Sequence, residues 1–204
     1  MIKDSTRIIL TVAAVLALFV LAGCGGKQVS RVDPEEVIDL SGEWNDVDSQ
    51  NVSAALTTQI TMSSWVEDFR AENGRKPYLI VAPVRNKSSE HVAVKTLTAD
   101  LERNFTNGGR VVVVASAEER DEIRGERADQ QEFSSLETMK QWGREKGADF
   151  MLIGELNMIV DQEGKEAVKF YQVDAYLVDI EDNTKVWAGF EKIKKYVGKS
   201  KYKG

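Results

Sequence analysis

The last third of the chain limits its possible folds most, because it predicts three long strands separated only by short polar breaks. The segments span residues 149–161, 166–180 and 185–197, and the breaks contain Glu163-Gly164 and Glu181-Asp182-Asn183. Breaks of this kind suit hairpin turns. In the middle segment an apolar set alternates with polar residues: Tyr171, Val173, Ala175 and Leu177 face one way, and Gln172 and Asp174 face the other. Such alternation is typical of an antiparallel sheet with one covered face.

The preceding residues alternate between helical and strand patterns. Apolar residues at spacings of three and four predict helices over 51–72 and 89–107, and Ser-x-x-Glu capping patterns predict helices over 117–131 and 135–146. Two short apolar runs, at 78–84 and 111–114, are typical of strands covered on both faces. The element order is therefore α-β-α-β-α-α-β-β-β. This order predicts an α+β fold in which helices pack on one mixed, mainly antiparallel sheet.

The only cysteine, Cys24, follows a segment with the composition of a secretory signal. Its mainly apolar run, 8–21, is shorter than the about 20 residues of a membrane-spanning helix. The ending Leu21-Ala22-Gly23-Cys24 resembles a bacterial lipoprotein signal, which implies that residues 1–23 are removed and that Cys24 carries acyl chains. Gly25 is not the Asp that typically retains such proteins at the inner membrane. The resemblance thus implies an outer-membrane anchor facing the periplasm; a spanning helix or an incidental cysteine are the alternatives.

The rest of the chain divides into a tether and a domain. Residues 24–49 hold few large apolar residues and predict a tether, whereas 50–204 predict one globular domain. Without a second cysteine no disulfide can form, so the fold depends on its apolar core. Trp44 would waste a large apolar surface in a linker, and we expect it to pack on the domain or on a partner.

Few residue patterns point to chemistry. His91 is the only histidine, which excludes a metal site built on imidazoles, and no glycine-rich loop precedes a helix as in phosphate-binding sites. Removal of residues 1–23 takes away two basic residues and one acidic residue and changes the net charge from −6 to −7, which does not favour nucleic acid. Arginines and acids mix at helical spacings over 117–131, which predicts either a solvated helix or a recognition face. We expect no cofactor, metal or small-molecule substrate.

Six stretches carry a further resemblance. They are LSGEWND at 40–46, VAPVRNKSSEHV at 81–92, GGRVVVVAS at 108–116, ERDEIRGERADQQ at 119–131, GADFMLIGEL at 147–156 and FYQVDAYLVDIEDNTKVWAG at 170–189. In this order they resemble the LpoB-type activators of penicillin-binding proteins. The resemblance implies an outer-membrane lipoprotein with an α+β domain similar to the N-terminal domain of TolB. It also implies that the protein binds and stimulates a bifunctional peptidoglycan synthase.

Surface-prone polar residues within these stretches are the candidate partner-binding residues. They are Arg85, Asn86 and His91 on the first strand–helix turn, and Arg120, Arg124, Arg127 and Gln131 on the charged helix. Each of them can instead hold its own turn or helix together. The tether is shorter than the proline-rich tether of the best-known family members, with Pro34 as its sole proline.

The leading hypothesis is a non-catalytic protein that activates a bifunctional penicillin-binding protein. An alternative is a structural or assembly lipoprotein of the outer membrane, of the curli-secretion type, without a synthase partner. An enzyme, such as a peptidoglycan hydrolase that uses paired carboxylates, is the third hypothesis.

Overall fold

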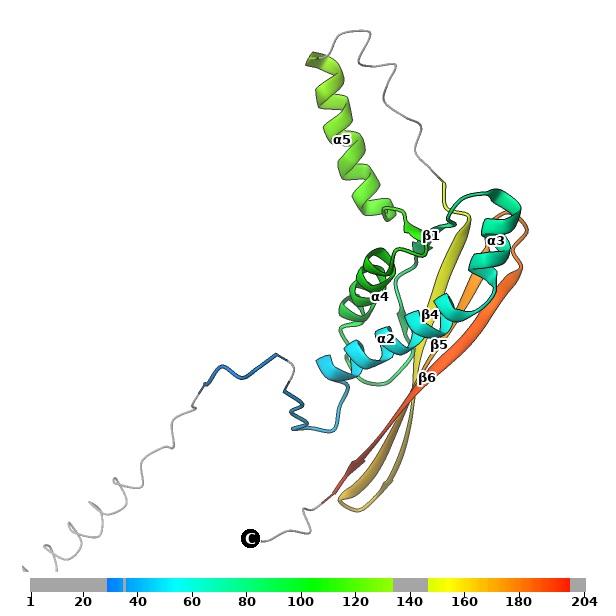
Figure 1. Cartoon of the computed structure of the whole chain (residues 1–204). Helices are drawn as coiled ribbons and strands as arrows, with labels where there is room; N and C mark the ends of the chain where they lie inside the picture. The colour runs from blue at the N-terminus through cyan, green and yellow to red at the C-terminus, as the bar shows by residue number, and fades with distance from the viewer. Residues whose placement is uncertain (1–28, 35, 134–146, 199–204) are drawn as a thin grey trace, which may run out of the picture. The chain divides into compact units, whose positions relative to one another are not determined.

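The fold is built on one mixed sheet of six strands (Figure 1). The computed structural model describes residues 29–34, 36–133 and 147–198. The strands are β1 (Tyr78–Val81), β2 (Arg85–Asn86), β3 (Val112–Val113), β4 (Phe150–Glu163), β5 (Glu166–Asp179) and β6 (Lys185–Val197). Their order is β3-β1-β4-β5-β6, and β2 continues the pairing of β1 along β4. The pairs among β1 to β4 are parallel and the β4–β5 and β5–β6 pairs are antiparallel, which confirms the predicted α+β fold class.

The three predicted C-terminal strands form an antiparallel meander. β4 and β5 pair from Phe150 opposite Asp179 to Glu163 opposite Glu166. The turns lie where the sequence analysis expects them. Gly164 and Asn183 there have φ values of 60° and 62°. Glycine and asparagine are the residues that adopt this left-handed conformation at the lowest cost, so the turn residues fix where each strand ends.

The two strands before the meander are shorter than predicted. The predicted strand 78–84 ends at Val81 and resumes as β2, where Arg85 lies opposite Glu155. Pro83 separates the two pieces because it has no N–H to donate to a ladder. The predicted strand 111–114 is paired over Val112–Val113 only.

Four helices lie in the described part of the chain: α2 (Asp46–Met62), α3 (Trp65–Asn73), α4 (Val94–Gly108) and α5 (Ala117–Phe133). The prediction of a single helix over 51–72 was therefore wrong, because the segment contains two helices, α2 and α3. The Trp65 indole N–H donates to the carbonyl of Ile60 at 2.8 Å, and Ser63 N–H and Oγ bind the same carbonyl. These donors satisfy the end of α2 and so favour a break there. The predicted helix 135–146 lies outside the described residues.

The start of α2 also differs from the prediction, because the helix begins at Asp46 rather than near residue 51. Asn45 accepts a hydrogen bond from the N–H of Asp48, and Asp48 accepts one from the N–H of Asn45. This reciprocal capping box satisfies two free donors at the helix end. The cap is therefore strong enough to start the helix before the apolar periodicity begins.

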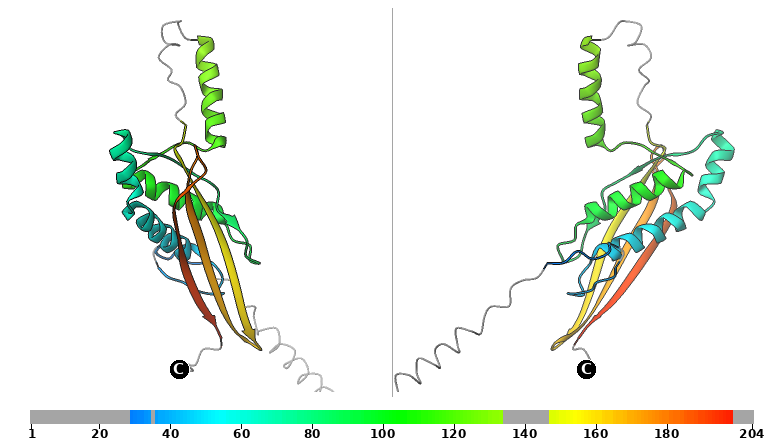
Figure 2. Two further views of the ribbon diagram at one scale, coloured as in Figure 1. Left: turned by 90° about the vertical axis from the view of Figure 1, so that its right-hand side faces the viewer. Right: turned by 60° about the vertical axis from the view of Figure 1, so that its left-hand side comes forward.

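The core lies between α2, α4 and one face of the sheet. α2 contacts β6, and α4 contacts β1 and β3. Leu56 of α2, Phe105 of α4, and Leu156 and Tyr171 of the sheet are each at most 1% exposed. Figure 2 shows α2, α3 and α4 on one side of the sheet. Burial of this single apolar face is the main stabilising term, as expected for a domain without a disulfide.

The described side chains of α5 contribute little to that core. Over 117–126 all of them are exposed except Arg120, which is half-buried. In the described part of the chain, no helix combines the length and the apolar character needed to cross a bilayer.

Candidate interaction surface

The sheet has one face that no described helix covers, and we call it the helix-free face (Figure 2). Strand register arranges its side chains in four rows that run across β4, β5 and β6. The rows are Ile153, Tyr176 and Ala188; Glu155, Asp174 and Phe190; Asn157, Gln172 and Lys192; and Ile159, Phe170 and Lys194. Gln172 and Asp174 are the two residues that the sequence analysis places on the side opposite the core, and that placement is confirmed.

Asp174 is the polar centre of the helix-free face. It accepts hydrogen bonds from Gln172 Nε2 at 2.6 Å and from Asn157 Nδ2 at 3.2 Å. The neighbouring Glu155 forms an ion pair with Arg85 at 2.8 Å, and both side chains are partly exposed. An exposed ion pair of this kind contributes little to stability. The hydrogen bonds and the ion pair fix the positions of the Asp174 and Glu155 side chains on the sheet. Partial exposure leaves the Arg85–Glu155 pair accessible to a partner.

Large apolar side chains surround this polar centre. Phe190 is 49% exposed and Ile159 is 66% exposed. Two shallow depressions, of about 340 and 210 Å³, lie beside Asp174, and Phe190 lines the first and Ile159 the second. The ammonium group of Lys192 lies 4.2 Å from the ring centroid of Phe190. Exposed aromatic residues beside fixed polar groups are typical of protein–protein interfaces.

The structure brings Arg85 onto the helix-free face but gives Asn86 a structural role. Asn86 Nδ2 donates to the carbonyl of Glu90 at 2.8 Å, and its Oδ1 accepts from the backbone N–H and hydroxyl of Ser88. These bonds fix the turn between β2 and α4. His91 lies on that turn with an exposed side chain.

The second group of candidate partner-binding residues lies on a different element, α5. Arg124 forms an ion pair with Asp121 at 2.8 Å, and the Nε of Arg120 is buried without a hydrogen-bond partner in the described part of the protein. Arg127 and Gln131 belong to the C-terminal half of the same helix. No described contact joins α5 to the Arg85 turn, so the structure presents two separate candidate surfaces.

Glu90, which the sequence analysis did not single out, is the charged centre of the turn. Its carboxylate accepts hydrogen bonds from Lys169 Nζ at 2.8 Å, Tyr171 Oη at 2.7 Å and the Trp44 backbone N–H at 3.3 Å. Burial alone would raise the pKa of Glu90, but the Lys169 and Tyr171 hydrogen bonds outweigh it and hold that pKa below 4.5. Burial and the Glu90 carboxylate together raise the pKa of Tyr171.

We expect Glu90→Gln to make stability less dependent on pH in the acid range. Because the folded pKa of Glu90 lies below 4.5, its stabilisation is present above that pH and is lost as the pH falls through the folded pKa. At neutral pH the substitution should lower the free energy of unfolding by about 1.5–3 kcal/mol, the range for hydrogen bonds to charged groups. Urea titrations between about pH 3 and about pH 7 measure both effects.

The matched control is Glu163→Gln, because Glu163 is an exposed carboxylate at the end of β4. It should keep the pH dependence of the wild type. Equal pH dependence of the Glu90 variant and the wild type would contradict the role given to Glu90.

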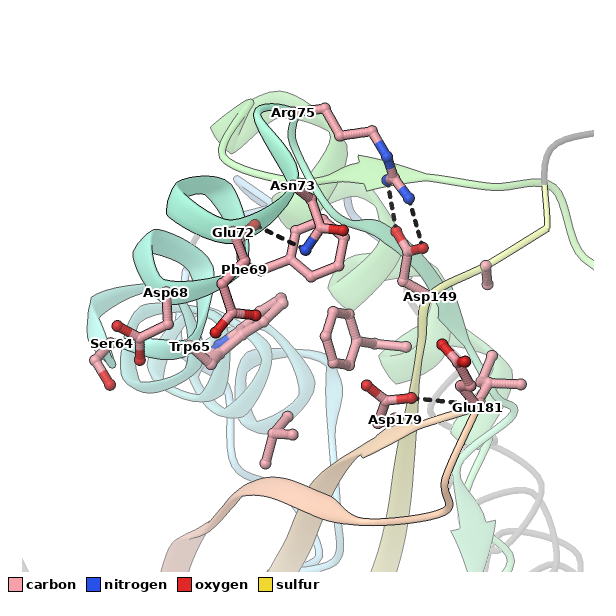
Figure 3. Close-up of a pocket in the computed structure, with 14 residues that line it drawn as sticks. Ser64, Trp65, Asp68, Phe69, Glu72, Asn73, Arg75, Asp149, Asp179 and Glu181 are labelled. Carbon is pink, nitrogen blue, oxygen red and sulfur yellow. Dashed lines mark hydrogen bonds and ion pairs between the residues drawn. The ribbon is translucent and has the colours of Figure 1, made fainter.

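A pocket lies between α3 and the start of β4 (Figure 3). Its volume is about 840 Å³. Trp65 and Phe69 each pack edge-to-face on Phe150, with centroids 5.0 and 5.4 Å away. Arg75 covers Phe69 and donates two hydrogen bonds to Asp149 at 2.7 and 2.8 Å. These contacts fasten the segment after α3 to the start of β4, and we assign them a structural role.

Asp149 shows the same electrostatic pattern as Glu90. Burial would raise its pKa, but hydrogen bonds from Arg75 and from the backbone N–H of Tyr78 hold the pKa of Asp149 below 3.8. Among the described side chains, no group of three or more His, Cys, Asp or Glu residues could hold a metal ion.

Comparisons with known proteins relate these features to a family. The family described as peptidoglycan-synthase activator LpoB matches residues 48–193, which include β1 to β5, most of β6 and most of α2. No curated protein sequence matches the chain.

Several solved structures are similar to it. The LpoB C-terminal domain from Salmonella enterica is 14% identical, with 72% of this chain and 99% of that chain covered and a TM-score of 0.42. The NMR structure of E. coli LpoB is 16% identical, with coverages of 85% and 83% and a TM-score of 0.42. Lipoprotein GNA1162 from Neisseria meningitidis is 18% identical, with coverages of 59% and 83% and a TM-score of 0.40. From the match over residues 48–193, the chain belongs to the LpoB family of peptidoglycan-synthase activators.

Proposed function

We propose that this protein is an outer-membrane lipoprotein, anchored through Cys24 and facing the periplasm, that binds and activates a bifunctional penicillin-binding protein. The family match over residues 48–193 carries this proposal. LpoB-family proteins are outer-membrane lipoproteins that act with penicillin-binding proteins, and their role is regulatory rather than enzymatic. The lipoprotein-like ending at Leu21-Ala22-Gly23-Cys24 supports the anchor.

The helix-free face is our proposed docking surface for the synthase. It combines exposed apolar side chains, such as Phe190 and Ile159, with the fixed polar groups of Asp174 and Arg85. A rigid sheet presents these groups without the entropy cost of ordering a loop on binding. The predicted surface on α5, with Arg120 and Arg124, is the second candidate for the same partner.

A non-catalytic activator must bind two conformational states of the synthase with different affinities. A protein that binds the active state more tightly shifts the population of the enzyme toward that state. An increase of about tenfold in the active fraction needs about 1.4 kcal/mol of difference in binding free energy. An interface of ordinary size can supply this difference.

The decisive experiment measures the glycosyltransferase rate of the cognate bifunctional synthase with and without the lipid-free chain from Gly25 onward. We expect the rate to rise with the concentration of added protein and to reach a plateau. Charge reversal of both Arg120 and Arg124 should leave the plateau in place if the synthase docks on the helix-free face. Loss of stimulation in that variant would instead assign docking to α5.

An absence of binding to any synthase would overturn the activator proposal. The assembly alternative then makes a different prediction, since a lipoprotein of that type should form a ring-shaped oligomer. Sedimentation of the acylated protein in detergent distinguishes the two outcomes.

A further inference from the structure

Residues 39–44 lie against the sheet without belonging to a helix or strand, and we call them the strap. Trp44 is the main contact of the strap. Its ring packs edge-to-face on Tyr171 with centroids 5.6 Å apart, and its indole N–H donates to Ser49 Oγ at 2.8 Å. The Trp44 backbone N–H donates to Glu90. This packing of Trp44 on the domain is the arrangement expected from the sequence.

Lys195 of β6 forms the second contact. Its ammonium group binds Asp39 at 2.8 Å, the carbonyl of Glu43 at 2.9 Å and Asp48 at 2.6 Å. The Lys195 side chain is only 9% exposed. One buried charge therefore joins both ends of the strap to the first turn of α2.

Gly42 is the third contact and the closest. It has a φ of 67°, and a Cβ added there would overlap Cγ2 of Val197 at the end of β6. Its carbonyl accepts a hydrogen bond from the Tyr171 hydroxyl at 3.4 Å. With Val197 opposite, the strap can reach this position only because residue 42 has no side chain.

Few apolar contacts hold the strap compared with the core. Of its residues, Asp39, Leu40, Ser41 and Glu43 are exposed, and Leu40 is 93% exposed. No strand ladder includes the strap, and Asp39, which forms the strap's ion pair with Lys195, has a side chain that is 47% exposed. Segments held in this way open at a lower free energy than the core they cover.

We propose that the strap is a detachable segment that sets the reach of the N-terminal tether. This inference rests on the proposed anchor at Cys24. With the strap docked, about 14 residues separate Cys24 from the first strap residue, and full extension spans about 50 Å. Release adds about six residues, or about 20 Å of extended chain, while Asn45 still caps α2 and the sheet and helices stay folded. The strap is thus a reserve of length for an anchored protein with a short tether.

Two variants change the strap in opposite directions. Gly42→Ala should release it, because the added methyl group meets Val197. Gly42→Cys combined with Val197→Cys should lock it, since the Cβ atoms would lie 3.7 Å apart and disulfides prefer about 3.5–4.5 Å. Gly74→Ala is the matched control, with a φ of 66° but no atom within 4 Å of an added Cβ.

Hydrogen exchange on the full-length protein, purified from membranes, tests detachment without any synthase. The peptide containing Trp44 should exchange at least about tenfold faster than the middle of β5 in the wild type, and faster still in Gly42→Ala. The oxidised lock should slow it to the rate of β5, and Gly74→Ala should match the wild type. Equal rates for the strap and β5 in the wild type, with no acceleration in Gly42→Ala, would overturn the proposal.

Neutron reflectometry of the acylated protein on a supported bilayer tests reach. The domain of Gly42→Ala should lie farther from the bilayer than that of the locked variant, and equal heights would overturn the role in reach. The mass of the purified protein shows separately whether Cys24 carries acyl chains. A failed anchor and a strap that does not open therefore give different results.

Discussion

Replacement of Phe190 by Asp is expected to weaken binding to the synthase at least about 30-fold, the effect of losing about 2 kcal/mol at a central aromatic contact. Phe190 is half-exposed on β6, in the same row as Asp174 and Glu155. The substitution removes an exposed aromatic surface and adds a third carboxylate to that row. Both changes oppose docking, because the new charge must be desolvated in the interface.

The fold should tolerate this change. The Phe190 side chain points away from the core, and its backbone carbonyl, which accepts from Gln59 Nε2 at 3.3 Å, is retained. We expect the free energy of unfolding to fall by less than about 1 kcal/mol, as for most surface substitutions. Binding is measured by surface-immobilised synthase titrated with the lipid-free protein, and stability by urea denaturation.

Met62→Asp is the control for adding a carboxylate in place of an exposed apolar side chain. Met62 is 82% exposed at the end of α2, on the side of the sheet that carries the helices. It should keep wild-type affinity. If Phe190→Asp also keeps wild-type affinity, the helix-free face is not the docking surface. If both variants lose affinity to the same extent, the loss is a nonspecific effect of the added charge.

Replacement of Cys24 by Ser is expected to remove the protein from the outer-membrane fraction entirely. A serine hydroxyl cannot form the thioether through which we propose that the lipid is attached at Cys24, so the variant should carry no acyl chains. Stable anchoring needs more than one acyl chain or a second membrane signal, and each buried CH₂ contributes about 0.8 kcal/mol. Metabolic labelling with an alkyne fatty acid, followed by membrane fractionation, measures the loss of label and of location.

Gly25→Asp separates lipidation from sorting. It leaves Cys24 intact, so the fatty-acid label should persist, while the residue type typical of inner-membrane retention should move the protein to the inner membrane. Persistence of the label in Cys24→Ser would show that the lipid is attached elsewhere or that the N-terminus is not a lipoprotein signal. Stimulation of the synthase in vitro by the lipid-free protein would remain compatible with the activator role, whatever the result of the labelling.

The meander was the most predictable part of the fold. Its strands alternate with a period of two, and each turn contains a residue suited to positive φ, so local sequence determines both strand and turn. The split between α2 and α3 was not predictable from periodicity, because it depends on the Trp65 indole reaching the Ile60 carbonyl. Tertiary hydrogen bonds of this kind leave no repeat in the sequence.

The candidate sites show the same limit. Arg85 was predicted to be accessible because it is a polar residue within a stretch that resembles the family, and the structure adds its partner Glu155. Glu90 was missed because its partners Lys169 and Tyr171 lie about 80 residues later in the chain, and only sheet pairing brings them together. Phe190 and Tyr176 could have been found from the alternation that placed Gln172 and Asp174 opposite the core.

The parallel pairing of β1 with β4 has a consequence for how the chain acquires its structure. The meander closes through local turns, whereas Leu79 must find Phe150 across about 70 intervening residues. Loop closure of that length is slow compared with hairpin formation, which takes microseconds. Because synthesis proceeds from the N-terminus, the residues of α2 and α4 emerge before β4, β5 and β6, which make up most of their sheet. Folding is expected to begin at the C-terminal hairpins and to finish only after β6 has formed, so loss of β6 would leave α2 without the strand that it contacts.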